Sequence, residues 1–522
     1  MHRAAFLSIV VALGAAAAGG AAACSSTSSG SGNNQGGGDD GGGGEAGAAM
    51  FSPALPCTDS IDSIYADPGD VSGLAKGAII KCAHDSDLSA ADLLAQAANG
   101  PDGGLPAYAG KPFTSGAHVY RLLYRTERGD ANSSPGYSSA LALIPDTPRS
   151  GPSTPLPLVV AAHGSRGQAG RCAPSRNDLA ASDVEPDFQH LVNPVVGFGF
   201  PVIAPDLAGY ANYGSANNPP SAYDNVQDVG KSNLDGARAL RQLIPSGVTQ
   251  QVVLIGHSQG GYTALDTLAE SNDYPIDGTI AAVAVYTPLW FSQRAWGAVL
   301  LEPQNYSFDQ SSAGTVSLWY HYTNGELLDG PGHGLDLIQP SKAAVVKAFV
   351  DNDCWSTAYP DLLDAGSSAN DFFLPSYVST ISKAATPLGN GDCKGDATCQ
   401  KWIDRMTSGW PHITGDAAKV PILVWYANDD VTITPDGMQC AFNRLSADGT
   451  NYQHCYDPNP VGHAGPPAVD NNYVVDWIAH ETLGEPAPQE NCQQLALNDA
   501  GVPQLVDDAG KPIPCNSLLP QQ

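Results

Sequence analysis

The feature that most constrains this chain is the pentapeptide Gly-His-Ser-Gln-Gly at 256–260. Apolar residues 252–255 predict a strand that runs into it, and residues 262–270 have the spacing of a helix that follows it. A serine between glycines at such a junction is typical of a sharp turn that exposes the hydroxyl and excludes side chains at Gly256 and Gly260. The bare pattern is weak in a chain with 57 glycines, so the flanking strand and helix carry the interpretation. Ser258 is therefore the predicted nucleophile.

Continuous apolar runs on both sides of this turn predict strands that are buried on both faces of a sheet. They lie at 156–162, 200–204, 251–255, 279–286 and 421–426. A helical pattern at 229–243, which ends before Pro245, falls between two of them. Strands that alternate with crossover helices predict a mainly parallel, doubly wound α/β sheet. Together with the serine turn they indicate the α/β-hydrolase fold.

The spacing of the predicted strands also divides the chain into parts. Residues 288–416 separate two strands and are too long for a plain loop, so we expect an inserted cap or lid domain. The catalytic domain then comprises residues 51–287 and 417–484. Residues 485–522 form a C-terminal tail rich in Pro, Gln and Asp, to which the sequence assigns no role.

A serine nucleophile needs a base that is oriented by a carboxylate, and in this fold the three follow in the order Ser, Asp or Glu, His. The strand at 421–426 leads directly into Asp429 and Asp430, so either carboxylate could be the acid. Ile433 and Pro435 resemble the residues that usually follow the acid, which favours Asp430. Ala427 stands where a glycine is common.

The predicted base is His463, which lies in the small-residue loop Gly-His-Ala-Gly at 462–465 before a helical pattern. His454 and His480 are the alternatives. His454 lies among strand-like residues beside Cys455, and His480 lies late in a helix, where a solvated histidine is the ordinary explanation.

Acyl transfer also needs N–H donors for the developing oxyanion, usually one after the nucleophile and one from the loop after an earlier strand. The backbone N–H groups of Gln259 and Ser165 are the candidates. The second rests on the His-Gly-Ser turn at 163–165, for which a plain glycine turn is the alternative.

The first 24 residues have the pattern of an export signal, with a short apolar run after His2 and Arg3. Small residues 21–23 before Cys24 resemble a bacterial lipobox, in which the cysteine is acylated; an ordinary signal-peptidase site is the alternative. Residues 25–50 are Gly- and Ser-rich and predict a disordered tether. We expect an exported, membrane-anchored lipoprotein at a periplasmic or cell-surface site, or otherwise a secreted protein.

Eleven cysteines, less an acylated Cys24, leave an even number for disulfides in an oxidising compartment. Short separations suggest the pairs Cys393 with Cys399, Cys440 with Cys455, and Cys492 with Cys515. No cysteine pair has CxxC spacing and no histidine pair has HxxxH spacing, so the sequence predicts no metal site.

The charge of the chain bears on its partners. With 53 acidic and 24 basic residues, the net charge of −29 would repel a phosphate backbone, so nucleic acid is not an expected partner. We expect a small-molecule ester or lipid as substrate and no cofactor.

The sequence resembles the secretory lipase (LIP-type) family of α/β-hydrolases over about residues 65–484. The similar segments are 120–126, the His-Gly turn at 163–164, Cys-Ala-Pro-Ser at 172–175, 256–261, and the segments around Asp430 and His463. The resemblance implies carboxylic-ester hydrolysis by Ser258, Asp430 and His463, and a cap that shapes the acyl-chain site. It also implies a disulfide between Cys172 and Cys354. The segment at 205–210 and Ala427 depart from the family pattern.

These residues predict a two-step acyl transfer through an acyl-enzyme. Trp290, Phe291 and Trp296 have a spacing that could line an acyl pocket, although such aromatics are more often core. A serine exopeptidase on the same fold is the first alternative function. A non-catalytic surface-binding lipoprotein is the second, and the presence of all three residue types in order argues against it.

Overall fold

A computed structural model describes the protein in a series of residue ranges between 51 and 515. The export signal, the tether and Cys24 lie outside these residues, as do Trp290, Phe291 and Trp296. In the described part of the chain, no helix combines the length and the apolar character needed to cross a bilayer. The ranges are 51–98, 107–151, 153–176, 187–212, 218–289, 312–355, 362, 365–366, 368–385, 391–430, 432–433, 435–457, 459, 461–489, 492–507 and 509–515.

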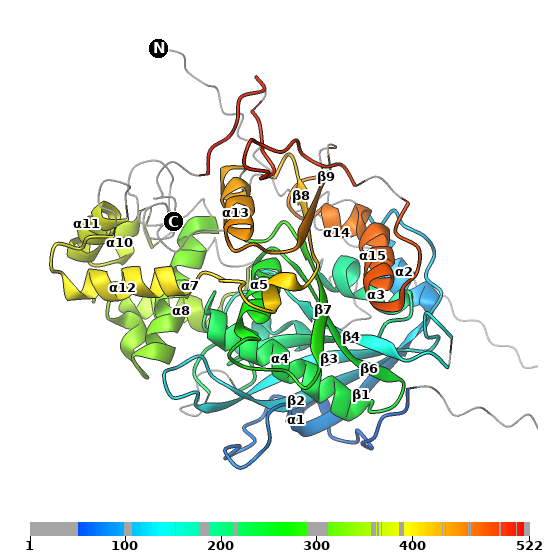
Figure 1. Cartoon of the computed structure of the whole chain (residues 1–522). Coiled ribbons are helices and arrows are strands. Elements are labelled where there is room, and N and C mark those ends of the chain that lie inside the picture. Colours follow the sequence, from blue (N-terminus) through cyan, green and yellow to red (C-terminus); the bar gives the residue numbers. More distant parts are fainter. Residues whose placement is uncertain are drawn as a thin grey trace, which may run out of the picture. The chain divides into compact units, whose positions relative to one another are not determined.

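The fold is built on a sheet of nine strands in the order β1-β2-β3-β5-β4-β6-β7-β8-β9 (Figure 1). Pairs from β1 to β5 along this order are antiparallel, and all pairs from β5 to β9 are parallel. The strands are β1 (Ile79–Leu88), β2 (Ala117–Glu127), β3 (Pro135–Pro145), β4 (Leu156–Ala162), β5 (Val202–Ala208), β6 (Val248–His257), β7 (Thr279–Tyr286), β8 (Ile422–Ala427) and β9 (Tyr452–Asp457).

The mainly parallel sheet and the α/β-hydrolase fold predicted from the sequence are confirmed. All residues of β4 and β5 are buried, as continuous apolar runs require. Strands β1, β2 and β3 were not predicted from the sequence. Polar side chains are mixed with apolar ones along β1 and β2, so no continuous apolar run marks these two strands, whereas β3 contains the apolar run at 140–144.

Helices surround the parallel part of the sheet. Helices α4 and α5 pack on each other and on β4–β7, while α15 packs on β7 and α3 on β3. Helix α4 starts three residues earlier than predicted, because the Asn225 side chain accepts the Asp228 N–H and caps it. These helices are α1 (Ile61–Ile64), α2 (Ala90–Ala98), α3 (Asn193–Gly197), α4 (Val226–Leu243), α5 (Gln259–Glu270), α13 (Pro435–Ala447), α14 (Pro466–Val469) and α15 (Asn471–Leu483).

The segment between β7 and β8 is helical where it is described, and its helices gather on the left of Figure 1. They are α7 (Ser312–Leu328), α8 (Ala343–Asn352), α10 (Ala369–Phe372), α11 (Pro375–Ala384) and α12 (Ala397–Ser408). Trp319 of α7 stacks on Phe349 of α8, and both belong to the same cluster of buried apolar side chains as the sheet. The insertion therefore shares the core of the sheet.

Five disulfides link the described cysteines: Cys57–Cys82, Cys172–Cys354, Cys393–Cys399, Cys440–Cys515 and Cys455–Cys492. Cys393–Cys399 agrees with the expectation from spacing, and Cys172–Cys354 agrees with the expectation from family resemblance.

Two of the predicted disulfides are wrong, because Cys440 pairs with Cys515 and Cys455 with Cys492. Short sequence separation was a poor guide to these two disulfides, because the entropy cost of closing a loop depends only weakly on the length of the loop. The C-terminal segment instead runs back over β9 and α13 and meets one cysteine on each (Figure 1).

This C-terminal segment also pairs with the edge of the sheet. The Tyr456 N–H of β9 donates to the Gln493 carbonyl at 2.9 Å, and the Leu495 N–H donates to His454 Nε2 at 2.8 Å. β9 is the last strand in the sheet order, so its open edge is covered there by the segment.

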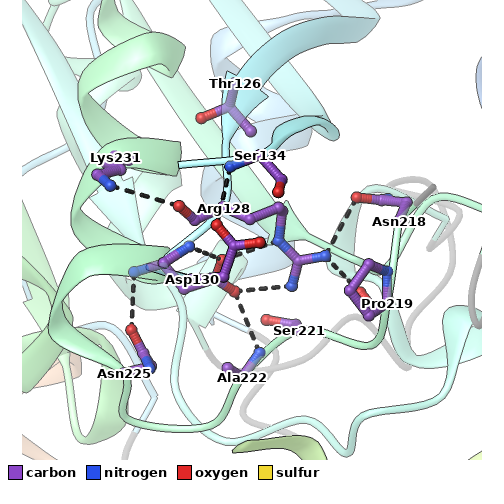
Figure 2. Close-up of polar contacts among 12 residues, drawn as sticks. Thr126, Arg128, Asp130, Ser134, Asn218, Pro219, Ser221, Ala222, Asn225 and Lys231 are labelled. Carbon is purple, nitrogen blue, oxygen red and sulfur yellow. Dashed lines mark hydrogen bonds and ion pairs between the residues drawn. The ribbon is translucent and has the colours of Figure 1, made fainter. Parts of the chain in front are cut away.

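A buried ion pair holds the loop before α4 (Figure 2). Arg128, 1% exposed, donates to both oxygens of Asp228 at 2.8 and 2.9 Å. The same guanidinium donates to the carbonyls of Pro219 and Pro220, and Asp228 accepts the Ala222 N–H. Because each buried charge has several partners, the pair fixes this loop instead of leaving an unsatisfied charge in the core.

Candidate active site

The turn that holds Ser258 joins the end of β6 to the start of α5. Ser258 has φ 57° and ψ −122°, a backbone conformation that a residue with a side chain rarely adopts. A Cβ atom at Gly256 would lie 2.0 Å from the Gly260 carbonyl oxygen, and one at Gly260 would lie 1.9 Å from the Ala162 carbonyl oxygen. Only glycine fits at both positions, so the sequence pattern reflects a steric requirement of the turn.

His463 lies between Ser258 and Asp430. Its Nε2 is 2.8 Å from Ser258 Oγ, and its Nδ1 is 2.7 Å from Asp430 Oδ2. A carboxylate only accepts hydrogen bonds, so Nδ1 carries the proton and Nε2 is left to accept the one from the serine hydroxyl. The three residues come from the ends of β6 and β8 and from the loop after β9, and the fold brings them together.

The neighbouring carboxylates Asp429 and Asp430 have different contacts. Asp430 is 4% exposed, and its Oδ1 accepts the N–H groups of Thr432 and Ile433 at 2.8 and 2.9 Å. Asp429 is exposed, and its Oδ1 accepts the Gly462 N–H at 2.9 Å. Asp430 is thus held against the imidazole of His463, while Asp429 is bonded to the loop that carries His463.

The alternative histidines are engaged elsewhere. His454 Nε2 accepts the Leu495 N–H, and burial lowers its pKa. His480 Nδ1 donates to the Glu485 carbonyl at 2.7 Å.

Two residues that sequence reasoning missed hold the backbone of His463. The Thr287 hydroxyl and His257 Nε2 both donate to the His463 carbonyl, at 3.1 and 3.0 Å. His257 occupies a variable position of the serine pentapeptide, and Thr287 follows the end of β7. Their positions next to the serine turn and at a strand end are the signals that could have identified them.

The segments that carry the candidate oxyanion donors lie beside each other. Gln259 is the first residue of α5, so its N–H has no acceptor within the helix. The Cβ position of Gly260, on the same turn, lies within 2.7 Å of the carbonyls of Ala162 and His163. The start of α5 therefore packs against the end of β4 at Ala162, three residues before Ser165.

The Ser165 turn is held by the loop before α4. Ser165 Oγ is 2.7 Å from the Tyr223 hydroxyl. The Tyr223 backbone is bonded in turn to α7, through the Thr323 hydroxyl and the Asn324 amide. Tyr223 follows Ala222 of the Arg128–Asp228 network, so that buried ion pair supports the turn indirectly.

A hollow of about 620 Å³ lies away from these residues. It is lined by the turn between β2 and β3, the end of α7 and Pro219, and Ser258, Asp430 and His463 do not line it. Its carboxylates already have partners within the protein: Asp130 accepts backbone N–H groups, and Asp329 pairs with Lys401 and Arg405. It therefore does not bear on the chemistry of Ser258.

Comparison with known proteins identifies the family of the chain. The model of the alpha/beta hydrolase family matches residues 159–511, which is more than half of the 522-residue chain. The chain belongs to the alpha/beta hydrolase family. No curated protein matches the sequence significantly.

Solved structures share the fold at low sequence identity. A ligand-bound form of the rice cell wall degrading esterase LipA from Xanthomonas oryzae has a TM-score of 0.57 at 17% identity, over 79% of this chain and 99% of that one. Candida antarctica lipase A has a TM-score of 0.58 at 16% identity, over 83% of this chain and 87% of that one. At such identities the similarity establishes the fold.

Proposed function

We propose that this protein is an exported serine hydrolase of carboxylic esters, a lipase or esterase. The observation that carries the proposal is the position of the His463 ring, which contacts Ser258 Oγ through Nε2 and Asp430 through Nδ1. This is the arrangement that turns a neutral hydroxyl into a nucleophile.

In the proposed reaction, His463 Nε2 takes the Ser258 proton as Oγ attacks the ester carbonyl. The N–H groups of Gln259 and Ser165 stabilise the negative oxygen of the tetrahedral intermediate. His463 then returns the proton to the leaving alcohol, which leaves an acyl-enzyme. Water then attacks the acyl carbonyl as the same imidazole takes its proton, the acyl–Oγ bond breaks to release the acid, and His463 returns the proton to Ser258 Oγ. Asp430 stabilises the imidazolium in both steps.

The similarity of this chain to known esterases and lipases favours ester substrates. The rice cell wall degrading esterase and Candida antarctica lipase A share its fold, and the sequence resembles the secretory (LIP-type) lipases. The helices between β7 and β8 would act as the cap over the acyl site. Their link to the Ser165 turn through Cys172–Cys354 and Tyr223 supports a cap in fixed relation to the catalytic residues.

Export and anchoring through Cys24 remain part of the proposal. Five disulfides in the described chain suit an oxidising compartment outside the cytoplasm. An acylated Cys24 followed by the tether at 25–50 would hold the catalytic domain at a membrane surface.

Active-site labelling and a substrate comparison test the proposal. We expect a fluorophosphonate to label the protein at Ser258, and the Ser258→Ala variant to remain unlabelled and to lose at least roughly 10³-fold in p-nitrophenyl ester hydrolysis. Absence of an adduct in folded protein would favour a binding protein. Aminoacyl-anilide hydrolysis that exceeds ester hydrolysis would favour an exopeptidase instead.

A further inference from the structure

We propose that His84, Asp87 and His118 form a binding site for a divalent transition-metal ion, with Zn²⁺ as the representative ion. The site lies on β1 and β2, at one edge of the sheet. Three strands separate β2 from β6 in the sheet order, so the site is distinct from Ser258 and its partners.

A β-bulge brings the three side chains to one face. Residues i and i+3 of a regular strand point to opposite faces. The register of β1 shifts between His84 and Ser86, however, so that His84 pairs with Tyr120 and Asp87 pairs with His118. Tyr120 and His118 are two residues apart on β2 and share a face, and the bulge places His84 and Asp87 on that face with them.

The ligand atoms converge on one point. Asp87 Oδ1 lies 3.0 Å from His84 Nε2 and 2.6 Å from His118 Nδ1, and all three atoms lie within 4.8 Å of one another. A tetrahedral Zn²⁺ with bonds of about 2.0–2.1 Å holds its ligands roughly 3.3 Å apart. Small side-chain rotations on a rigid strand pair would therefore be enough to admit the ion.

The site also has the surroundings that orient metal ligands. His118 Nε2, the nitrogen that faces away from the cluster, lies 3.2 Å from Asp146 Oδ1. A carboxylate on the second nitrogen of a ligating imidazole fixes its tautomer and raises its basicity. Space for this carboxylate exists because residue 116 is glycine, where a Cβ atom would lie 2.5 Å from Asp146 Oδ2. The Tyr120 ring contacts the edge of the His84 ring at 5.3 Å between centroids.

The donor set selects the class of ion. Two imidazole nitrogens and one carboxylate oxygen suit Zn²⁺, Ni²⁺ or Cu²⁺, while Ca²⁺ and Mg²⁺ prefer oxygen ligands only. All three side chains are exposed, so water can complete the coordination. Local spacing in the sequence does not reveal this set, because its ligands come from two strands that meet only through tertiary pairing.

Zinc titration by calorimetry on the full chain without a histidine tag, after treatment with chelator, tests the proposal. We expect one Zn²⁺ site of micromolar affinity, and no comparable binding of Ca²⁺. His84→Gln and His118→Gln should each weaken Zn²⁺ binding at least about 10-fold, and Asp146→Asn about 10-fold or more through the imidazole it orients.

His333→Gln is the matched control, because exposed His333 pairs with Asp336 at 2.8 Å but belongs to no cluster of three metal-ligating side chains among the described residues. It should bind Zn²⁺ as the wild type does. Circular dichroism and the Tm of each variant establish that it is folded, and Zn²⁺ should raise the Tm of the wild type but not of His118→Gln. The proposal is overturned if the wild type binds no Zn²⁺ below 100 µM, roughly a hundred times the micromolar expectation, or if His84→Gln and His118→Gln bind it unchanged.

Discussion

Asp429 and Asp430 are adjacent in the chain, yet their carboxylates have different contacts. Asp430 is buried and bonded to two N–H groups and to His463, whereas Asp429 is exposed and bonded to the Gly462 N–H. The preference for Asp430 in the sequence rested on the residues that follow it. Both carboxylates lie in the turn after β8, and this turn directs Asp430 to the imidazole.

Replacing each carboxylate by its amide tests which of the two orients His463. Asp430→Asn is expected to lower kcat for a p-nitrophenyl ester by roughly 10³–10⁴-fold, because an amide next to Nδ1 favours the wrong tautomer of His463. Asp429→Asn loses one loop contact, so we expect a loss of less than about 10-fold. Steady-state kinetics on both variants, with Ser258→Ala as the baseline, make the comparison. A larger loss in Asp429→Asn would assign the acid to that residue.

The C-terminal segment and strand β9 are linked by hydrogen bonds and by a disulfide. The segment covers the open edge of β9, and disulfides from Cys492 and Cys515 attach it to β9 and α13. The loop that carries His463 begins directly after β9. The sequence offered no role for these residues, because their contacts are with elements that precede them by many residues.

The disulfide of β9 provides the test of this element. Cys455→Ser with Cys492→Ser opens a link across 37 residues, whereas Cys393→Ser with Cys399→Ser opens one across 6. The chain-entropy model predicts that the first pair lowers the free energy of unfolding by roughly 1–2 kcal/mol more than the second. Urea denaturation of the two double variants measures the difference. Equal losses would mean that the segment adds no constraint to the sheet edge.

For the whole molecule, acidity is the dominant electrostatic property. The net charge is −29, and some carboxylates lie inside the protein. Burial raises the pKa of Glu270, at the end of α5, to about 7, and it raises the pKa of Asp266 one turn earlier. Burial shifts the pKa of His321 in α7 in the opposite direction and lowers it to about 4.

The shift of Glu270 predicts how stability depends on pH. Between pH 4.5 and about 7 the folded protein keeps the Glu270 proton that the unfolded chain releases, so this residue lowers stability as the pH rises through that window. Glu270→Gln cannot titrate. Its free energy of unfolding relative to wild type should therefore increase by roughly 1–3 kcal/mol from pH 5 to pH 8.

Urea denaturation at the two pH values measures this change, and taking the difference between variant and wild type cancels the opposing contribution of His321. Glu481→Gln, at a partly exposed position of α15, is the matched control for the replacement of a glutamate by glutamine. A constant difference between Glu270→Gln and wild type would exclude the assigned pKa.

Local sequence patterns were enough to predict the α/β-hydrolase fold, the serine turn and the sequence in which the candidate residues follow one another. Buried parallel strands are continuous apolar runs, and the turn at Ser258 tolerates only glycine at Gly256 and Gly260. Tertiary folding was needed to pair Cys440 with Cys515 and to bring His84 and Asp87 beside His118. Both arrangements depend on the meeting of segments that are distant along the chain, and such a meeting has no local signal in the sequence.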